Sequence, residues 1–153
     1  MWYRLSGDSI ENIRVVIAND IVKKGEKADL KFYVGCDSQS YKDHVVYVTA
    51  IVLYENGKGG LGYYTRDIEK PVPMRYRLWN ETFKAVTTAT WLNQLLGEYD
   101  YRVDEVHADL NSDEKHLSQS SVTECLGFIT SMGFVGKIKP DAWVASGIAD
   151  QKT

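Results

Sequence analysis

The sequence predicts an α/β fold in which a mixed five-stranded sheet is flanked by helices, with an additional helix at the N-terminus. Three observations lead to this prediction. Three strand-like segments rich in β-branched and aromatic residues follow one another, a long amphipathic helical pattern comes next, and helical patterns then separate two further strand-like segments. Strands one to three are therefore expected to be antiparallel, and strands four and five to run parallel to strand one. All 153 residues are expected to form one domain, 1–153.

The first half of the chain begins with a helix predicted over 8–24. Asp8 and Glu11 form a capping-box pattern, isoleucines and valines recur at helical spacing, and Gly25 is a typical C-terminal stop. The turn dipeptide Asn56-Gly57 predicts a reversal between two of the strands that follow. Strands are predicted over 31–37, 45–54 and 61–68.

The second half begins with the longest helical pattern, which carries a buried apolar stripe and ends at Gly97. A second capping-box pattern, Ser121 with Glu124, opens a later helix that ends at Gly133. The predicted elements are a helix over 74–96, a strand over 103–110, a helix from 121, a strand over 134–138 and a helical segment after Pro140.

Composition and charge limit the classes of protein to which this chain can belong. Apolar residues make up 44% of the chain and charged residues 25%, which favours a soluble globular protein over a disordered one. The N-terminus lacks a signal-peptide pattern, and no apolar run approaches the ~20 residues that span a bilayer. Cys36 and Cys125 lie in apolar stretches, which predicts buried thiols in a reducing, cytoplasmic setting. The formal charge of −3 excludes nucleic-acid binding through overall charge, so any such contact must be local or bridged by metal ions.

Acidic residues recur at the ends of predicted strands and on the helix between them. Asp37 ends the first strand, Asp109 ends the fourth, and Glu81 lies on the flank of the buried stripe of the 74–96 helix. Taken alone, each aspartate could equally be a turn residue. The Glu81 side chain could equally reach solvent or pair with Arg77. Together they predict one acidic cluster, which divalent cations would neutralise.

The last helical segment offers two further carboxylates. Asp150 shares a helical face with Trp143 and Gly147, and it is either a fourth ligand or a frayed terminal residue. Asp141 follows Pro140 and is better explained as a helix cap. Four carboxylates in this arrangement can hold two cations about 3.5–4 Å apart, as in phosphodiester-cleaving enzymes with two-metal sites.

The element order and several short motifs resemble the ribonuclease H-like superfamily. The motifs Tyr33-Val34-Gly35-Cys36-Asp37 and Val106-His107-Ala108-Asp109, with the ending Ala145-Ser146-Gly147-Ile148-Ala149-Asp150, are similar to its small, largely uncharacterised YkuK-type branch. The resemblance covers roughly residue 31 to the end. It implies a nuclease that uses Mg²⁺ or Mn²⁺, with Asp37, Glu81, Asp109 and Asp150 as metal-binding and catalytic carboxylates.

Substrate contacts are predicted from polar and basic residues near these carboxylates. Cations interleave with aromatic residues around Arg66 and Arg77, a composition that suits a nucleic-acid strand, although local packing explains it as well. The other predicted contacts are Gln39, Asn111, Lys115 and His116.

The sequence therefore predicts a hydrolase that cleaves RNA or DNA, with nucleic acid as its partner and no membrane association. The alternative is a module that binds nucleic acid or another partner and has lost catalysis. A phosphotransferase on a related fold is disfavoured, because such proteins usually duplicate the domain and this chain has one copy.

Overall fold

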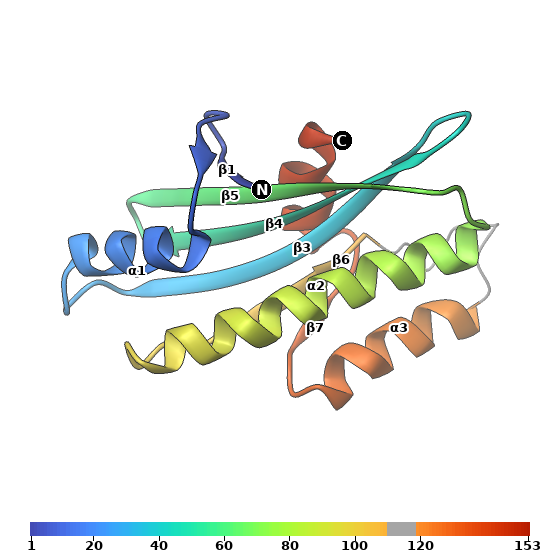
Figure 1. Ribbon diagram of the computed structural model, residues 1–153. Coiled ribbons are helices and arrows are strands. Elements are labelled where there is room, and N and C mark those ends of the chain that lie inside the picture. The colour runs from blue at the N-terminus through green and yellow to red at the C-terminus, as the bar shows by residue number, and fades with distance from the viewer. Residues whose placement is uncertain (110–118) are drawn as a thin grey trace.

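A computed structural model describes residues 1–109 and 119–153. Its sheet has seven strands, in the order β2-β1-β5-β4-β3-β6-β7 (Figure 1). The strands are β1 (Trp2–Arg4), β2 (Ser9–Ile10), β3 (Leu30–Ser40), β4 (Val45–Glu55), β5 (Gly59–Glu69), β6 (Glu105–Ala108) and β7 (Gly136–Lys137). The antiparallel order of β3, β4 and β5 and the parallel pairing of β6 with β3 confirm the predicted directions.

The prediction of five strands is wrong, because the N-terminus adds two short strands beside β5. Trp2 pairs with Thr65 of β5 and with Ile10 of β2, so residues assigned to the start of a helix extend the sheet instead. These strands have three and two residues, which is too short for side-chain alternation to reveal them. The first helix begins later, because the Asn12 side chain accepts the Val15 N–H and caps it.

Among the described residues, three α-helices and two short helical turns complete the fold. Gly25 ends the first helix as predicted, and the long second helix has the predicted bounds within one residue. The segment after Pro140 is a π-helical turn followed by a 3₁₀ turn, where a helix was predicted. The elements are α1 (Ile13–Lys24), α2 (Met74–Gly97), α3 (Gln119–Ser131), η1 (Val144–Ala149) and η2 (Asp150–Lys152).

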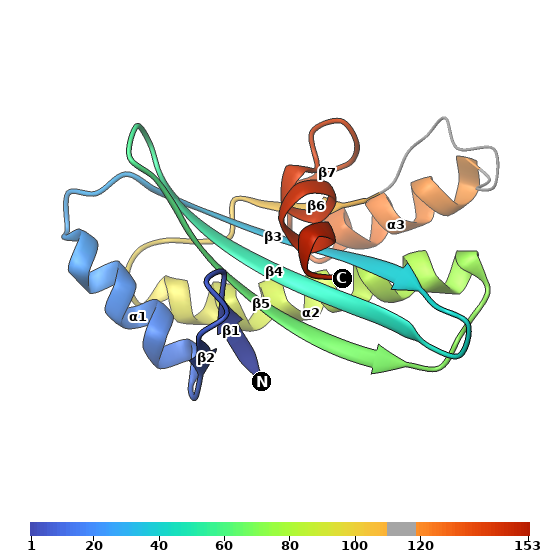
Figure 2. The same ribbon diagram turned by 90° about the horizontal axis from the view of Figure 1, so that it is seen from above.

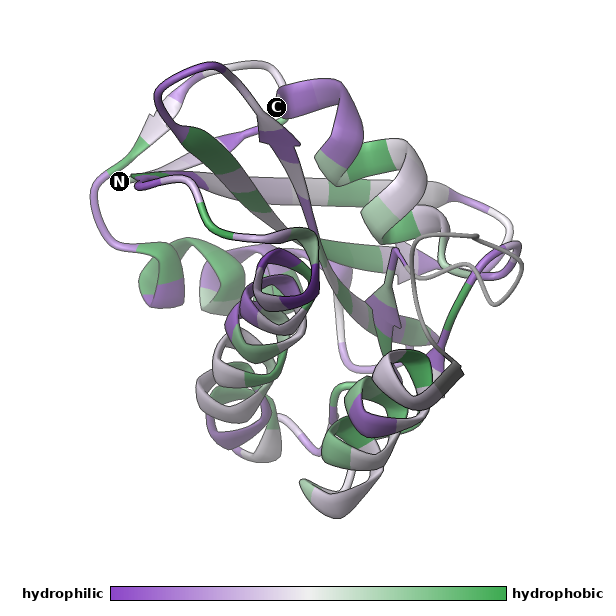
Figure 3. Ribbon diagram, turned by 90° about the vertical axis from the view of Figure 1, so that its right-hand side faces the viewer, coloured by the Kyte–Doolittle hydropathy of each residue, from purple (hydrophilic) through white to green (hydrophobic). Residues whose placement is uncertain are grey.

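The sheet separates two layers of unequal size. Helices α1, α2 and α3 cover one face, and the C-terminal turns η1 and η2 lie over the other (Figures 1 and 2). The end-on view shows α2 and α3 side by side below the sheet and the C-terminal segment above it (Figure 3). Strand β4 is buried along nearly its whole length, which explains its continuous apolar sequence.

The main core lies between the helices and the sheet. Alternate residues of β3, including Phe32, Val34 and Cys36, point into it and meet the apolar stripe of α2 at Ala85, Ala89 and Leu92. A smaller apolar cluster on the opposite face joins Val48 and Ala50 of β4 to Val144 and Ala149 of η1. Both cysteines are buried and free, as predicted.

Candidate active site

Two neighbouring parallel strands bring Asp37 and Asp109 together. Cys36 of β3 pairs with Ala108, the last residue of β6, and the residue that follows each of them is an aspartate. The prediction that the first strand ends at Asp37 is wrong, because β3 continues to Ser40 and pairs with β4 throughout. Asp37 is therefore a residue within a strand, only 5% exposed, and the turn interpretation does not apply to it.

Carboxyl groups surround the Asp37 side chain. Burial raises its pKa to about 9, together with a hydrogen bond to Asp150, the charge of Glu81, and the hydrogen bond and charge of Asp109. A hydrogen bond between two carboxyl groups requires one of them to carry a proton. In the absence of a cation, the cluster therefore retains protons that isolated carboxylates would lose at neutral pH.

Helix α2 supplies Glu81 from the other side of the sheet. Glu81 is 4% exposed, and its Oε2 accepts a hydrogen bond of 2.9 Å from the Ser38 hydroxyl. Burial raises the pKa of Glu81 to about 8; the Ser38 hydrogen bond opposes this, and the charge of Asp109 adds to it. The charges of Arg77 and Lys139 favour the ionised form. Glu81 is thus a buried acid held next to the two strand aspartates.

The C-terminal turn η2 places Asp150 beside Asp37, within hydrogen-bonding reach. Asp141, the other candidate for this position, is exposed and has no part in the raised pKa of Asp37 or Glu81. The four carboxylates that the sequence predicted as a set therefore lie in one cluster, drawn from β3, α2, the end of β6 and η2.

Asp109 carries the clearest sign of an incomplete environment. Its Oδ1 lies 3.1 Å from the Lys139 Nζ in an ion pair, but this buried atom makes no directional hydrogen bond among the described residues. Carboxylate oxygens are the donors that Mg²⁺ and Mn²⁺ prefer, so the residues suit a divalent cation in their chemistry. In the described part of the chain, however, no three His, Cys, Asp or Glu side chains are already spaced as a metal site.

The predicted substrate residues divide into three groups. Arg77 lies near Glu81, and its buried Nε has no hydrogen-bond partner among the described residues. Arg66 is exposed in the row Asp37–Val48–Arg66 across β3, β4 and β5, roughly 10 Å from Asp37 at the usual strand spacing. Gln39 is exposed near the end of β3. Asn111, Lys115 and His116 fall outside the described residues.

The sequence reasoning did not identify two site residues. Ser38 donates to Glu81, and Lys139 pairs with Asp109. Ser38 directly follows Asp37, just beyond the predicted end of the strand, so the direction of its side chain could not be inferred. Lys139 lies just after β7, and its pairing depends on the position of β7 beside β6, which local patterns do not specify.

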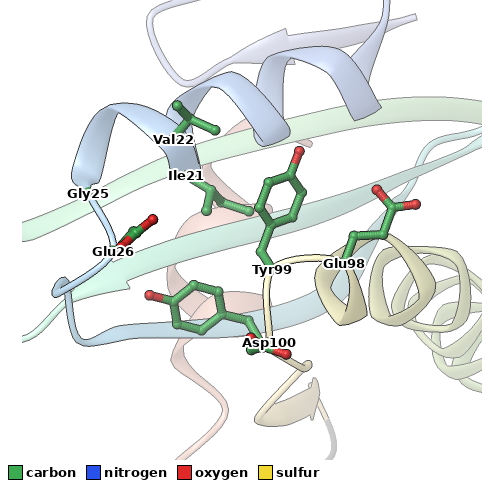
Figure 4. A pocket seen from close by; sticks show the side chains of 8 residues that line it. Ile21, Val22, Gly25, Glu26, Glu98, Tyr99 and Asp100 are labelled. Carbon is green, nitrogen blue, oxygen red and sulfur yellow. The ribbon is translucent and has the colours of Figure 1, made fainter.

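A groove of about 800 Å³ lies elsewhere, where α1 and α2 both end (Figure 4). Its walls include Ile21, Tyr99 and Tyr101, and Glu26 and Glu98 also line it. These residues lie near the start of β3, whereas Asp37 lies toward its other end. The groove is therefore separate from the acidic cluster.

Comparison with known proteins identifies the family of this chain. The model of the family described as Ribonuclease H-like matches residues 14–153. This chain belongs to the ribonuclease H-like family. A protein of Bacillus subtilis (strain 168) with the printed name "Uncharacterized protein YkuK" is 32% identical over 146 residues, which cover 86% of this chain and 84% of that protein.

Membership of the ribonuclease H-like family indicates an activity related to nucleic acid, and nucleases of this family typically use divalent metals. The matched region includes all four clustered carboxylates and excludes the two short N-terminal strands. Within the described residues, no helix is both long and apolar enough to cross a membrane.

Proposed function

We propose that this protein is a metal-dependent nuclease that hydrolyses phosphodiester bonds of RNA or DNA. One observation carries the proposal: the carboxylates of Glu81, Asp109 and Asp150 lie around the buried Asp37 side chain, and burial together with these neighbours raises the pKa of Asp37 to about 9. A fold gains nothing in stability from such a cluster, since buried carboxylates without a cation are costly. A cation-binding role explains why the residues are placed together.

In this proposal Asp37 and Asp109 hold the central cation, and Glu81 and Asp150 complete the site. Bound Mg²⁺ or Mn²⁺ would supply an activated water and neutralise charge at the phosphodiester. The protein's own groups bind and orient the substrate. Arg77 lies beside Glu81 with an unsatisfied Nε, a donor suited to a phosphate oxygen. Arg66, on the row that includes Asp37, would contact the nucleic-acid strand farther from the carboxylates.

A second candidate is a nucleic-acid-binding module that has lost catalysis. It is favoured by the absence, among the described residues, of carboxylates already spaced for a metal ion. In that case the cluster would lower the affinity for phosphates, and removing a negative charge would raise it.

Cleavage of labelled RNA, DNA and hybrid substrates in Mg²⁺ or Mn²⁺ tests both candidates. The variants are Asp37→Asn and Asp109→Asn, with Asp67→Asn as a control, because Asp67 is a surface carboxylate that pairs with Lys84 outside the cluster. The nuclease proposal expects cleavage by the wild type and the control, and none by the two site variants or with chelator. Equal cleavage by all four proteins would contradict it. Binding without cleavage, strengthened in the site variants, would support the second candidate.

A further inference from the structure

The π-helical turn η1 is the element that delivers Asp150 to the cluster. It packs across β3, β4 and β6 and buries Val144, Ala145 and Ala149. Asp150 follows directly as the first residue of η2. Any change in how η1 rests on the sheet therefore moves the carboxylate that lies against Asp37. Turns of this kind are rare in proteins and occur frequently at functional sites.

Gly35 sets how closely η1 approaches β3. A Cβ atom at this position would lie 2.7 Å from the Ala145 backbone nitrogen and 3.0 Å from Val144 Cγ1. The first distance is shorter than real Cβ atoms essentially ever show, so a side chain of any size would push η1 away from the sheet. Glycine is required here for the space it leaves for η1.

His107 holds η1 from the neighbouring strand. It is fully buried, its Nδ1 lies 3.2 Å from the Val144 backbone nitrogen, and its Nε2 lies 2.9 Å from Glu105 Oε1. A backbone N–H can only donate, so Nδ1 accepts and the ring proton is on Nε2, where it donates to Glu105. The rings of Tyr33 and Trp143 pack against the imidazole and fix its plane.

These two residues are direct partners across the sheet. Gly35 pairs with His107 in the parallel register of β3 and β6, and each precedes its strand's aspartate by two positions. Alternate residues of a strand share a face, so the docking pair and the carboxylates Asp37 and Asp109 form adjacent rows beneath the C-terminal segment. The sequence thus contains two parallel patterns, Gly-x-Asp and His-x-Asp, in which the first residue docks η1.

We propose that Gly35 and His107 are positioning residues that dock η1 and thereby place Asp150 against Asp37, which sets the affinity of the cluster for a divalent cation. The part about cation affinity rests on the proposed function. Neither residue belongs to the four-carboxylate set. Their effect is transmitted through η1.

The first test is calorimetric titration of Mn²⁺ into the purified full chain. Compared with the wild type, His107→Leu is expected to weaken Mn²⁺ binding by about 10–100-fold, the usual cost of losing a supporting contact, and Gly35→Ala to act in the same direction. His107→Asn keeps an acceptor close to the Nδ1 position and should restore part of the affinity. Tyr63→Phe is the matched control, because it removes a buried hydrogen bond to Asp20 with no connection to η1.

The second test is backbone hydrogen exchange over residues 144–152 in the metal-free protein. Faster exchange is expected in His107→Leu and Gly35→Ala and not in Tyr63→Phe. Exchange identical to the wild type in both variants would overturn the inference. The inference would also be overturned if His107→Leu bound Mn²⁺ as tightly as the wild type while Asp150→Asn bound it more weakly. If the wild type binds no Mn²⁺, the proposed function and the cation part of the inference both fail, and faster exchange would still support the docking part.

Discussion

Asp20 and Asp37 are both 5% exposed, yet their surroundings are opposite. Asp20 on α1 accepts two hydrogen bonds from the Arg4 guanidinium, at 3.1 and 3.3 Å, and a third from the Tyr63 hydroxyl. Asp37 has three other carboxylates around it. Burial alone therefore does not distinguish a carboxylate with compensating partners from one surrounded by other carboxylates. The charges and hydrogen-bond donors around it do.

The comparison also separates what each residue does for folding. Asp20 joins β1, α1 and β5, which lie next to one another only in the folded protein. Its charge is compensated on every side, as buried charges must be. Asp37 lacks such compensation, because the neighbouring carboxylates oppose its ionisation. Proteins tolerate such local conflicts mainly at functional sites, where a ligand resolves them.

The largest expected difference between the two residues is in catalysis. Asp37→Asn should lower phosphodiester cleavage by more than about a hundredfold, because even loss of an outer supporting contact at a metal site costs up to that much. Asp20→Asn should leave the turnover of folded molecules close to the wild type. Single-turnover assays corrected for the folded fraction measure both. Similar losses in both variants would show that Asp37 acts only through the fold.

Stability should separate the two residues in opposite directions. Asp20→Ala is expected to lower the free energy of unfolding by about 3 kcal/mol, at the lower end for a broken buried pair because Arg4 can return to water. Asp37→Asn should raise the free energy of unfolding of the metal-free protein at neutral pH, since an amide avoids the cost of keeping this carboxyl group protonated far above its ordinary pKa. Urea unfolding in chelator measures both. A destabilised Asp37→Asn would mean that Asp37 already has a compensating partner.

The pH dependence of stability sharpens the comparison. The pKa of Asp37 is raised from 3.8 to about 9 and that of Glu81 from 4.5 to about 8, so the folded protein binds more protons than the unfolded chain between these values. The stability from these groups is fully present below about pH 4 and is lost as pH rises through 8 and 9. Metal-free wild type should therefore lose several degrees of melting temperature between pH 7 and 8.5.

The interval from pH 7 to 8.5 lies above the range in which His107 titrates, since burial lowers the pKa of its imidazole below 6.5. Asp37→Asn should show a shallower decline, and saturating Mn²⁺ should flatten the wild-type curve. Differential scanning fluorimetry at matched ionic strength records all three curves. Parallel curves for the wild type and Asp37→Asn would exclude the carboxylate cluster as the cause.

Local patterns in the sequence predicted some elements well and others poorly. The 24 residues of α2 carry a long apolar period, so the helix could be predicted, and with it the position of Glu81 on the flank of the buried stripe. The short strand β2 could not, because Asp8 with Glu11 imitates a helix cap. The C-terminal segment has helical spacing, and that spacing does not distinguish a π-helical turn from an α-helix. The order of the elements was enough to predict which carboxylates lie close together. Their roles as metal ligands stay predictions.

Contacts between distant segments account for what the sequence could not predict at the site. The hydrogen bond from Val144 to His107 spans 37 positions, and that from Ser38 to Glu81 spans 43. No local period encodes either pairing. Each depends on how β6, η1 and α2 pack on β3, and this packing is decided by the whole core.

The smallest expected effect concerns Lys139, the basic residue paired with Asp109. A unit charge about 4 Å away contributes roughly 1 kcal/mol even in a water-like dielectric, so Lys139→Met should raise the Mn²⁺ affinity at least about fivefold. Lys137→Met is the control, because Lys137 lies in β7 two residues earlier. Titrations at low and high salt measure the difference. Equal Mn²⁺ affinities in Lys139→Met and Lys137→Met would show that the cation binds away from Asp109. In that case Asp37, without Asp109, would be the carboxylate to contrast with Asp20.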